Sequence, residues 1–261
     1  MKFNLYYKNK NCRLYQCDNL ELLKQLPDNY IDLIYCDILY NTGKKFKDYV
    51  DNLGTTKQAI DWYEPRLIEM QRILKETGSI YLQCDYRLVH YLKINMDKVY
   101  GDNNFRRDII WCYTSGGISK SDFPCKHDNI LKYSKSKTYT YNPILKPYSE
   151  KTLKRGLTKC KGDYELSDQG TPIVDWWNDI TPLLSPTCYE RTGYDTQKPK
   201  ALLERIIKSS SNEGDLVADF FMGSGTTGEV ALELGRKFIG CDIGDRACEI
   251  TKDRINKIIS L

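Results

Sequence analysis

The chain has 261 residues, of which 41% are hydrophobic, and this is enough to bury the core of one large domain. No apolar run approaches the roughly 20 residues of a membrane helix, and the opening stretch MKFNLYYKNKNC is polar, so we expect a soluble, cytoplasmic protein without a membrane anchor. The net charge is only +4, but the positive charge is concentrated in one region of the chain.

The first 113 residues alternate short apolar runs with helical patterns. Strands are predicted at residues 12–17, 31–36, 79–84 and 107–113. Helices are predicted at 20–26, with Asp18 as the N-cap, and at 56–75, ended by Gly78. Pro65 must either kink the second helix or mark its true start, because proline cannot donate the helical hydrogen bond.

Residues 114–190 do not continue this alternation of predicted strands and helices. They hold one predicted strand, 129–134, among glycines, prolines and lysines, and an aromatic cluster in VDWWNDI at 174–180. We predict an inserted lobe here, since a disordered linker would not carry two adjacent tryptophans. From 114 to 161, ten lysines and one arginine stand against three acidic residues, a net charge of +8, with four tyrosines interleaved. This composition suits a phosphate backbone and unstacked bases, although a solvated, lysine-rich surface would have it too.

The last third of the chain returns to the alternation. Strands are predicted at 215–220 and 237–242, and helices at 201–211, just after Pro199, at 226–235, ended by Gly235, and at 247–259. Strands that alternate with helices predict an α/β fold, with a Rossmann-like, doubly wound and mostly parallel sheet between two layers of helices.

No metal site is expected. The ten cysteines are scattered without any C-x-x-C pair, and only His90 and His127 are available, so the ligand clusters of a zinc site are missing from the sequence. Reduced and mostly buried thiols are the better explanation for the cysteines.

The most informative glycine motif lies between residues 215 and 243, in DLVADFFMGSGTTGEVALELGRKFIGCDI. Gly223, Gly225 and Gly228 form a complete G-x-G-x-x-G, and Asp242 follows the first glycine by 19 residues. A dinucleotide fold uses this spacing for a tight turn and for ribose hydroxyls, so an NAD-linked oxidoreductase is one hypothesis. S-adenosylmethionine also presents an adenosine to such a strand tip. Only 19 residues follow Asp242, so the sheet must be completed from upstream strands in a permuted order, which favours the methyl donor.

Three motifs in this permuted order resemble the beta group of DNA amino-methyltransferases. That group carries a D-P-P-Y catalytic motif, then a DNA target-recognition region, then an F-x-G-x-G cofactor motif. The counterparts here are DILY at 37–40, the basic middle segment and FMGSG at 221–225, and TQKP at 196–199 also resembles the approach to the cofactor motif. The resemblance implies a catalytic half of the core in residues 1–113, a target-recognition region in 114–190 and a cofactor-binding half in 191–261.

The resemblance implies catalytic roles for Asp37, Ile38 and Tyr40. The lone pair of an exocyclic amine is delocalised into the ring, so the Asp37 carboxylate and the backbone carbonyl of Ile38 would localise it by accepting hydrogen bonds from the amine. Tyr40 would stack on a base flipped out of the helix. Ile38 and Leu39 replace the two prolines, so packing must hold the bend, and Phe220 stands where the group commonly has proline.

The implied cofactor is S-adenosylmethionine. Asp219 is expected at the amino group of its methionine part, Phe221 beside it, and Asp242 at its ribose. Asp18 either lies near the adenine or only caps a helix, and Gln197 and Lys198 either contact the cofactor or only form a turn. The predicted cofactor-binding residues are Asp18, Asp37, Gln197, Lys198, Asp219, Phe221, Gly223, Gly225 and Asp242.

The resulting prediction is a site-specific methyltransferase that acts on the exocyclic amine of adenine in double-stranded DNA. Adenine is preferred because, in the resembling group, an acidic residue at the first motif position points to adenine more often than to cytosine. Cytosine methylation by the same mechanism, a DNA-binding protein with an impaired catalytic bend and, more remotely, the NAD-linked oxidoreductase stay open. A homodimer and a companion restriction endonuclease also stay open.

Overall fold

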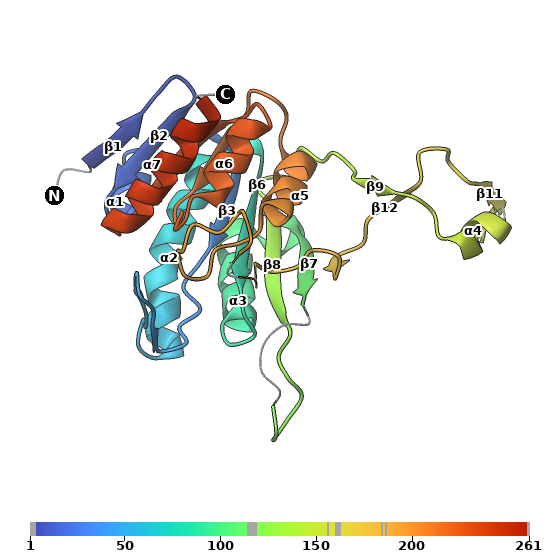
Figure 1. The fold of residues 1–261 in the computed structure, drawn as a ribbon, viewed down its shortest axis with the longest axis horizontal. Coiled ribbons are helices and arrows are strands. Elements are labelled where there is room, and N and C mark those ends of the chain that lie inside the picture. Colours follow the sequence, from blue (N-terminus) through green and yellow to red (C-terminus); the bar gives the residue numbers. More distant parts are fainter. Residues whose placement is uncertain are drawn as a thin grey trace.

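The computed structural model describes residues 4–113, 119–155, 157–159, 163–183, 185 and 187–259. Within them, a central sheet of nine strands has the order β1-β2-β15-β14-β3-β6-β8-β7-β13 (Figure 1). Its strands are β1 (Asn4–Lys8), β2 (Cys12–Gln16), β3 (Ile31–Asp37), β6 (Leu74–Cys84), β7 (Phe105–Cys112), β8 (His127–Ser134), β13 (Trp176–Trp177), β14 (Leu216–Asp219) and β15 (Lys237–Asp242). Only β1–β2, β6–β8 and β7–β8 pair antiparallel among these described strands, so the predicted mostly parallel sheet is confirmed.

Helices cover both faces of this sheet (Figure 1). Helices α1 (Asn19–Leu23), α2 (Thr56–Ile73) and α3 (Val89–Tyr100) pack on one face, and α5 (Lys200–Ser210), α6 (Thr226–Glu233) and α7 (Asp245–Ile259) on the other. The alternation of side chains along β3 explains the two cores, because Ile34 and Cys36 point into the first, and Leu33 and Tyr35 into the second. The predicted doubly wound α/β class is confirmed.

All seven predicted strands are present, and so are the predicted helices, but some bounds differ. Helix α2 begins at Thr56, where Thr55 and Gln58 form a capping box, so Pro65 lies inside the helix and does not mark its start. The prediction that Gly78 ends this helix is wrong, because α2 ends at Ile73 and β6 follows at once. Strand β1 and helix α3 were not predicted.

Gly78 has a packing role instead. It lies inside β6, and a Cβ atom there would lie 3.0 Å from the backbone oxygen of Asp32, in β3. Glycine therefore allows a close approach of two backbones at the start of the paired strands. The predicted N-cap of α1 is confirmed, since Asp18 accepts a hydrogen bond from the amide of Leu20 at 2.8 Å.

One part of the region 114–190 belongs to the core sheet, and another part extends away from it. Strands β8 and β13 belong to the sheet, whereas the described residues between 145 and 172 extend away from it as an arm (Figure 1). The arm holds β9 (Leu145–Lys146), α4 (Glu150–Arg155), β10 (Leu157–Lys159), β11 (Asp163–Glu165) and β12 (Thr171–Pro172). Residues 114–118, 156, 160–162, 184 and 186 of the predicted basic region lie outside the described residues.

Three smaller elements complete the fold: the short strands β4 (Lys44–Lys45) and β5 (Val50–Asp51), which pair with each other, and a 3-10 turn at Asp102–Asn104. In the described ranges, no helix is both long enough and apolar enough to cross a membrane.

Candidate active site

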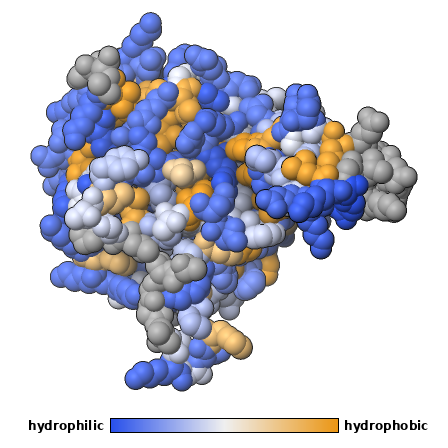
Figure 2. Space-filling view, turned by 45° about the vertical axis from the view of Figure 1, so that its right-hand side comes forward, coloured by the Kyte–Doolittle hydropathy of each residue, from blue (hydrophilic) through white to orange (hydrophobic). Residues whose placement is uncertain are grey.

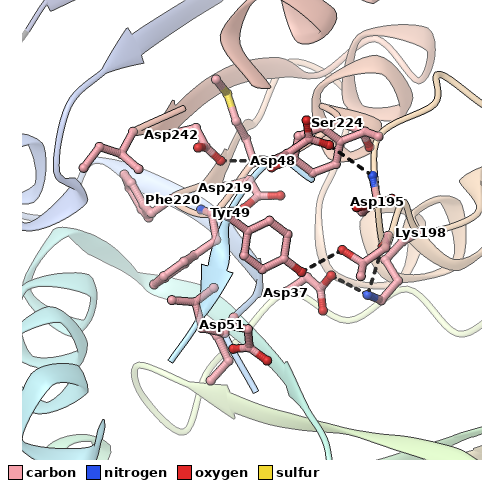
Figure 3. Close-up of a pocket in the computed structure, with 18 of the residues that line it drawn as sticks. Asp37, Asp48, Tyr49, Asp51, Asp195, Lys198, Asp219, Phe220, Ser224 and Asp242 are labelled. Atoms are coloured by element: carbon pink, nitrogen blue, oxygen red, sulfur yellow. Dashed lines mark hydrogen bonds and ion pairs between the residues drawn. The ribbon is translucent and has the colours of Figure 1, made fainter. Parts of the chain in front are cut away.

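A cavity of about 440 Å³ lies at the carboxyl ends of the parallel strands β2, β3, β14 and β15 (Figure 3). This edge of an open α/β sheet is where ligands bind, because loops and helix N-termini converge there. Of the predicted site residues, Gly225 alone does not line the cavity, and it lies between the lining residues Ser224 and Thr226. The predicted residues that line it are Asp18, Asp37, Ile38, Tyr40, Gln197, Lys198, Asp219, Phe221, Gly223 and Asp242.

Asp37 ends β3 and points into this cavity, where the amine of Lys198 meets its carboxylate (Figure 3). The Tyr40 hydroxyl lies 2.8 Å from Asp37 Oδ1. Burial raises the pKa of the Asp37 carboxyl, and Lys198 opposes that rise through its charge and its hydrogen bond. Lys198 therefore favours the ionised form of a carboxylate that is otherwise costly to bury.

The bend of DILY is held without its prolines, by packing and two hydrogen bonds. Ile38 is buried in the core, and its amide lies 3.3 Å from the carbonyl oxygen of Gln83. Tyr63, from α2, donates its hydroxyl to the carbonyl oxygen of Leu39 at 2.8 Å. Tertiary contacts thus supply the constraint that fixed φ angles would have given.

The loop after the bend is organised around Asp51, which sequence reasoning missed. The buried carboxylate of Asp51 accepts hydrogen bonds from the amides of Asn41 and Thr42, at 2.8 and 3.0 Å, and from the Thr42 hydroxyl. Asn41 has a φ of 55°, a conformation that asparagine tolerates better than most residues. These contacts fix the direction in which the chain leaves Tyr40.

Asp128 is a second carboxylate at the DILY bend that sequence reasoning missed. It is the second residue of β8, and its Oδ2 lies 3.0 Å from the Tyr40 hydroxyl. The side chains of Gln83 and Tyr113 also donate to it, at 2.9 and 3.1 Å. In the sequence, Asp128 stands just before a predicted strand, which gives a weak indication of a site residue. Because β8 runs antiparallel to β6, the start of β8 lies at the edge of the sheet where the parallel strands end.

The glycine turn between β14 and α6 lies at the cavity, where Gly223 lines it. Gly225 is the N-cap of α6 with a φ of 75°, and a Cβ atom there would lie 2.4 Å from Thr251 Oγ1. The amide of Gly223 donates to Asp242 Oδ2 at 2.9 Å, which ties the turn to the end of β15. The contact at Gly225 requires a residue without a side chain, and Gly223, with a φ of 47°, adopts a conformation that favours glycine.

Asp219 and Asp242 place two buried carboxyl groups on the cavity wall. Asp219 accepts hydrogen bonds from the Phe221 amide at 3.0 Å and from the Thr227 hydroxyl at 2.6 Å. Burial nevertheless raises the pKa of Asp219 to about 7. Burial also raises the pKa of Asp242, although backbone amides, that of Gly244 among them, stabilise its charged form.

The side chains whose roles the sequence left undecided already have protein partners. Asp18 both caps α1 and forms an ion pair with Arg66 at 2.8 Å, while lining the cavity. Gln197 accepts hydrogen bonds from the amide and hydroxyl of Thr192 and donates to the carbonyl of Glu190, so its amide group holds the preceding turn. These contacts favour the structural interpretation of Gln197.

An aromatic wall borders the cavity on the α2 side. The ring of Phe221 lies 6.1 Å from that of Trp62 and 6.3 Å from that of Tyr63, measured between centroids. The guanidinium of Arg66 lies 3.3 Å from the centroid of the Trp62 ring. Trp62 was not predicted as a site residue, because a helical sequence pattern does not indicate which of its side chains line a cavity.

Residues 46–49 run along the cavity, and Phe46, Asp48 and Tyr49 line it. The Asp48 carboxylate accepts a hydrogen bond from Arg246, in α7, at 2.6 Å. The amide of Lys47 donates to Asp195 at 2.9 Å, and the Tyr49 and Thr196 hydroxyls are 3.0 Å apart. The segment that follows the catalytic bend is thus tied to the segment that precedes α5.

The family of DNA methylases designated N6_N4_Mtase matches residues 31–253. DNA adenine methyltransferase YhdJ of Escherichia coli (strain K12) is 33% identical over 247 residues, which are 92% of this chain and 81% of YhdJ. Among solved structures, the PvuII DNA methyltransferase (cytosine-N4-specific) is similar with a TM-score of 0.72 at 20% identity, over 97% of this chain and 89% of that one. The M1.HpyAVI–SAM complex is similar with a TM-score of 0.60 at 22% identity, over 94% and 99%. This chain belongs to the N6_N4_Mtase family of DNA methylases.

Proposed function

We propose that this DNA methylase is a site-specific adenine methyltransferase of the cytoplasm, which moves the methyl group of S-adenosylmethionine to the exocyclic amine of a flipped adenine in duplex DNA. The observation that carries the proposal is the place of Asp37. Its carboxylate ends β3 and lines the same cavity as the glycine turn after β14, the neighbouring strand. A hydrogen-bond acceptor for the amine and the cofactor loop therefore border one space.

The cofactor is S-adenosylmethionine, as predicted from the sequence. The chain belongs to a family of DNA methylases, and M1.HpyAVI was solved with SAM. The cavity suits this cofactor, because Asp219 offers a buried carboxylate to a cationic amino group and Phe221 stands in an aromatic wall. When bound, it supplies an electrophilic methyl group on a sulfonium. Methyl transfer is incompatible with the NAD-linked alternative.

Asp37, Ile38 and Tyr40 activate and hold the target amine in this proposal. An ionised carboxylate has about four acceptor positions, and Tyr40 and Lys198 use two of those on Asp37. The others accept from the amine and, together with the Ile38 carbonyl, localise the nitrogen lone pair as it attacks. Tyr40 stacks on the flipped base, and Lys198 keeps Asp37 ionised in its buried position.

The choice of adenine rests on two likenesses and not on the geometry. Aspartate at the first position of DILY resembles the adenine enzymes of the beta group, and YhdJ is named as an adenine methyltransferase. The PvuII enzyme is named as cytosine-N4-specific, so cytosine methylation stays as the second candidate. Both bases present an amine beside a ring nitrogen, and Asp37 would serve either.

DNA recognition is assigned in this proposal to residues 114–190, between a catalytic half in 1–113 and a cofactor-binding half in 191–261. The arm supports it, because it stands out from the body of the molecule (Figures 1 and 2) and its helix α4 exposes Lys151, Lys154 and Arg155. Strands β8 and β13 of this range remain parts of the core sheet. A homodimer and a companion restriction endonuclease stay predictions.

The test combines a product assay with a single substitution. Wild-type protein, unmethylated genomic DNA and S-adenosylmethionine are incubated, the DNA is digested to nucleosides, and methylated bases are identified by mass spectrometry. We expect N6-methyladenine, and a loss of at least about a hundredfold in rate for Asp37→Asn with DNA and cofactor binding retained. Asp61→Asn, on the exposed side of α2, is the matched control.

Each other outcome has a definite meaning. N4-methylcytosine would keep the mechanism and replace the base. Full activity of Asp37→Asn would contradict the role given to the carboxylate. DNA and cofactor binding without any methylated base from the wild-type protein would identify it as a DNA-binding protein with an impaired catalytic bend.

A further inference from the structure

The hydroxyl of Tyr40 faces two carboxylates but carries one proton. It lies 2.8 Å from Asp37 Oδ1 and 3.0 Å from Asp128 Oδ2. Both distances are within hydrogen-bond range, so the hydroxyl can donate to either carboxylate with little movement of the ring. Asp37 comes from β3 and Asp128 from β8, so two strands that are not neighbours in the sheet converge on this hydroxyl.

Neutral donors fix Asp128 in place. The residue is 6% exposed, and its hydrogen-bond donors in the described part of the chain are the neutral side chains of Tyr40, Gln83 and Tyr113. Gln83 donates to its Oδ2 at 2.9 Å and Tyr113 to its Oδ1 at 3.1 Å. The carbonyl of the Gln83 amide accepts from Tyr35 at 2.6 Å, so the amide nitrogen must point at Asp128. A buried carboxylate with these donors has one well-defined position.

Asp37 binds a cation, whereas the partners of Asp128 among the described residues are the neutral side chains of Tyr40, Gln83 and Tyr113. Asp37 binds Lys198 and, under the proposed function, must also accept a hydrogen bond from the target amine. A bond from Tyr40 to Asp37 withdraws acceptor strength from that amine, because donors that share one carboxylate weaken each other's bonds. A bond from Tyr40 to Asp128 leaves that acceptor strength to the amine.

We propose that Asp128 is a positioning residue for methyl transfer, which takes over the Tyr40 hydroxyl bond while Asp37 bonds the target amine. The proposal rests on the proposed function and adds a residue to its machinery. No proton is transferred: the hydroxyl keeps its hydrogen and changes its acceptor. The Tyr40 ring stays anchored at its far end, in the orientation in which it stacks on the flipped base.

The electrostatics of the bend agree with this role. Asp128 raises the pKa of the Asp37 carboxyl by charge repulsion, in the same direction as burial and against Lys198 and the Tyr40 hydrogen bond. A carboxylate of higher pKa is a stronger hydrogen-bond acceptor. Asp128 therefore strengthens Asp37 as an acceptor and offers the Tyr40 hydroxyl a second partner.

The test is a double-mutant cycle on Asp128→Asn and Tyr40→Phe. We expect Asp128→Asn to lower the single-turnover methyl-transfer rate about tenfold, which is about 1.4 kcal/mol in activation free energy. The cofactor Kd should stay unchanged. In the Tyr40→Phe background, the same substitution should change the rate little, because there is no hydroxyl left to place. Asp97→Asn is the control, since Asp97 also accepts from a tyrosine hydroxyl, that of Tyr133, away from the cavity.

Three results would overturn the proposal. The first is a wild-type rate in Asp128→Asn. The second is an equal loss with and without the Tyr40 hydroxyl, which would mean that Asp128 acts by another route. The third is absence of methyl transfer from the wild-type protein, which would remove the proposed function as well. If Asp128→Asn does not fold, Asp128→Glu takes its place, because it keeps the charge and moves the oxygens by one methylene away from their present contact.

Discussion

We predict that Asp219 makes cofactor binding depend on pH near neutrality. Burial and, to a smaller extent, repulsion from Asp37 and Asp242 together raise its pKa to about 7. Below that pH the carboxyl is neutral and no longer attracts a cationic amino group, so cofactor affinity should fall as the pH is lowered from about 8 to about 6. Asp219→Asn should bind more weakly at the higher pH and lose most of this dependence. Calorimetric titration across the range measures both effects.

The control for this titration is Asp61→Asn, which changes an exposed carboxylate on α2 and should keep the wild-type profile. A wild-type affinity that is the same at both ends of the range would contradict the role of Asp219. An unchanged pH profile in Asp219→Asn would assign the dependence to the other buried carboxyl groups, Asp37 and Asp242.

The site residues that the sequence predicted are those that belong to a recognisable local pattern, such as the end of a strand or a glycine turn. Asp37 and Asp219 end strands that were visible as apolar runs, and the glycine turn follows one of them directly. Asp128 and Asp51 could not be found in this way, because their role depends on which distant loop or strand comes to lie beside the bend. The ion pair of Lys198 with Asp37 likewise joins residues 161 positions apart.

At the scale of elements, α6 packs so closely on β15 that one methyl group decides the fit. Gly228 lies in α6, and a Cβ atom there would lie 2.6 Å from the ring of Phe238. Helix propensity alone predicts that Gly228→Ala stabilises the protein by about 1 kcal/mol. Overpacking of this kind costs about 1 to 3 kcal/mol, which equals or exceeds the gain from helix propensity. We therefore expect Gly228→Ala to be less stable than the wild-type protein, or at most equally stable.

Chemical denaturation of Gly228→Ala measures the difference, with Gly228→Ala in a Phe238→Leu background as the matched comparison. The smaller side chain should relieve the contact, so the alanine should cost less there than in the wild-type protein. A clear gain in stability from Gly228→Ala alone would show that the helix and the strand separate at no cost.

The sequence patterns of α3 and β1, which were not predicted, are weak for different reasons, and α2 shows how context overrides a proline. Helix α3 exposes Tyr91 and Ile94 besides its buried residues, which blurs its apolar periodicity. Strand β1 is an edge strand with little burial, so its pattern is weak. In α2, the capping box at Thr55 and the buried face outweigh the loss of one hydrogen bond at Pro65.

At the scale of the molecule, the fold brings together two motifs that lie far apart in the chain. Strand alternation predicted a parallel sheet, but not that β14 would lie beside β3, which places FMGSG next to DILY. That neighbourhood was implied by the resemblance to a permuted family and not by any local pattern. The antiparallel strand β8 between β6 and β7 was not predicted, because the sequence of a strand does not indicate its direction in the sheet.

The uneven distribution of charge predicts how DNA binding responds to salt. The region from 114 to 161 carries a net charge of +8, against −4 for the rest of the chain. Each phosphate contact of a cation contributes about −0.9 to the slope of log K against log salt concentration. If α4 contacts the duplex, replacing Lys151, Lys154 and Arg155 by alanine should weaken DNA binding at low salt and make the slope less steep by up to about 3.

Fluorescence anisotropy at several salt concentrations gives the slope, and cofactor affinity should stay the same because the arm does not line the cavity. The matched control replaces Lys8, Lys10 and Lys257, which are exposed near the β1 edge of the sheet and the end of α7. Since both triple variants lose the same net charge, a long-range effect would change both slopes equally, whereas direct phosphate contacts would change only that of the α4 variant. Equal slopes in both variants and the wild type would place the DNA away from the arm.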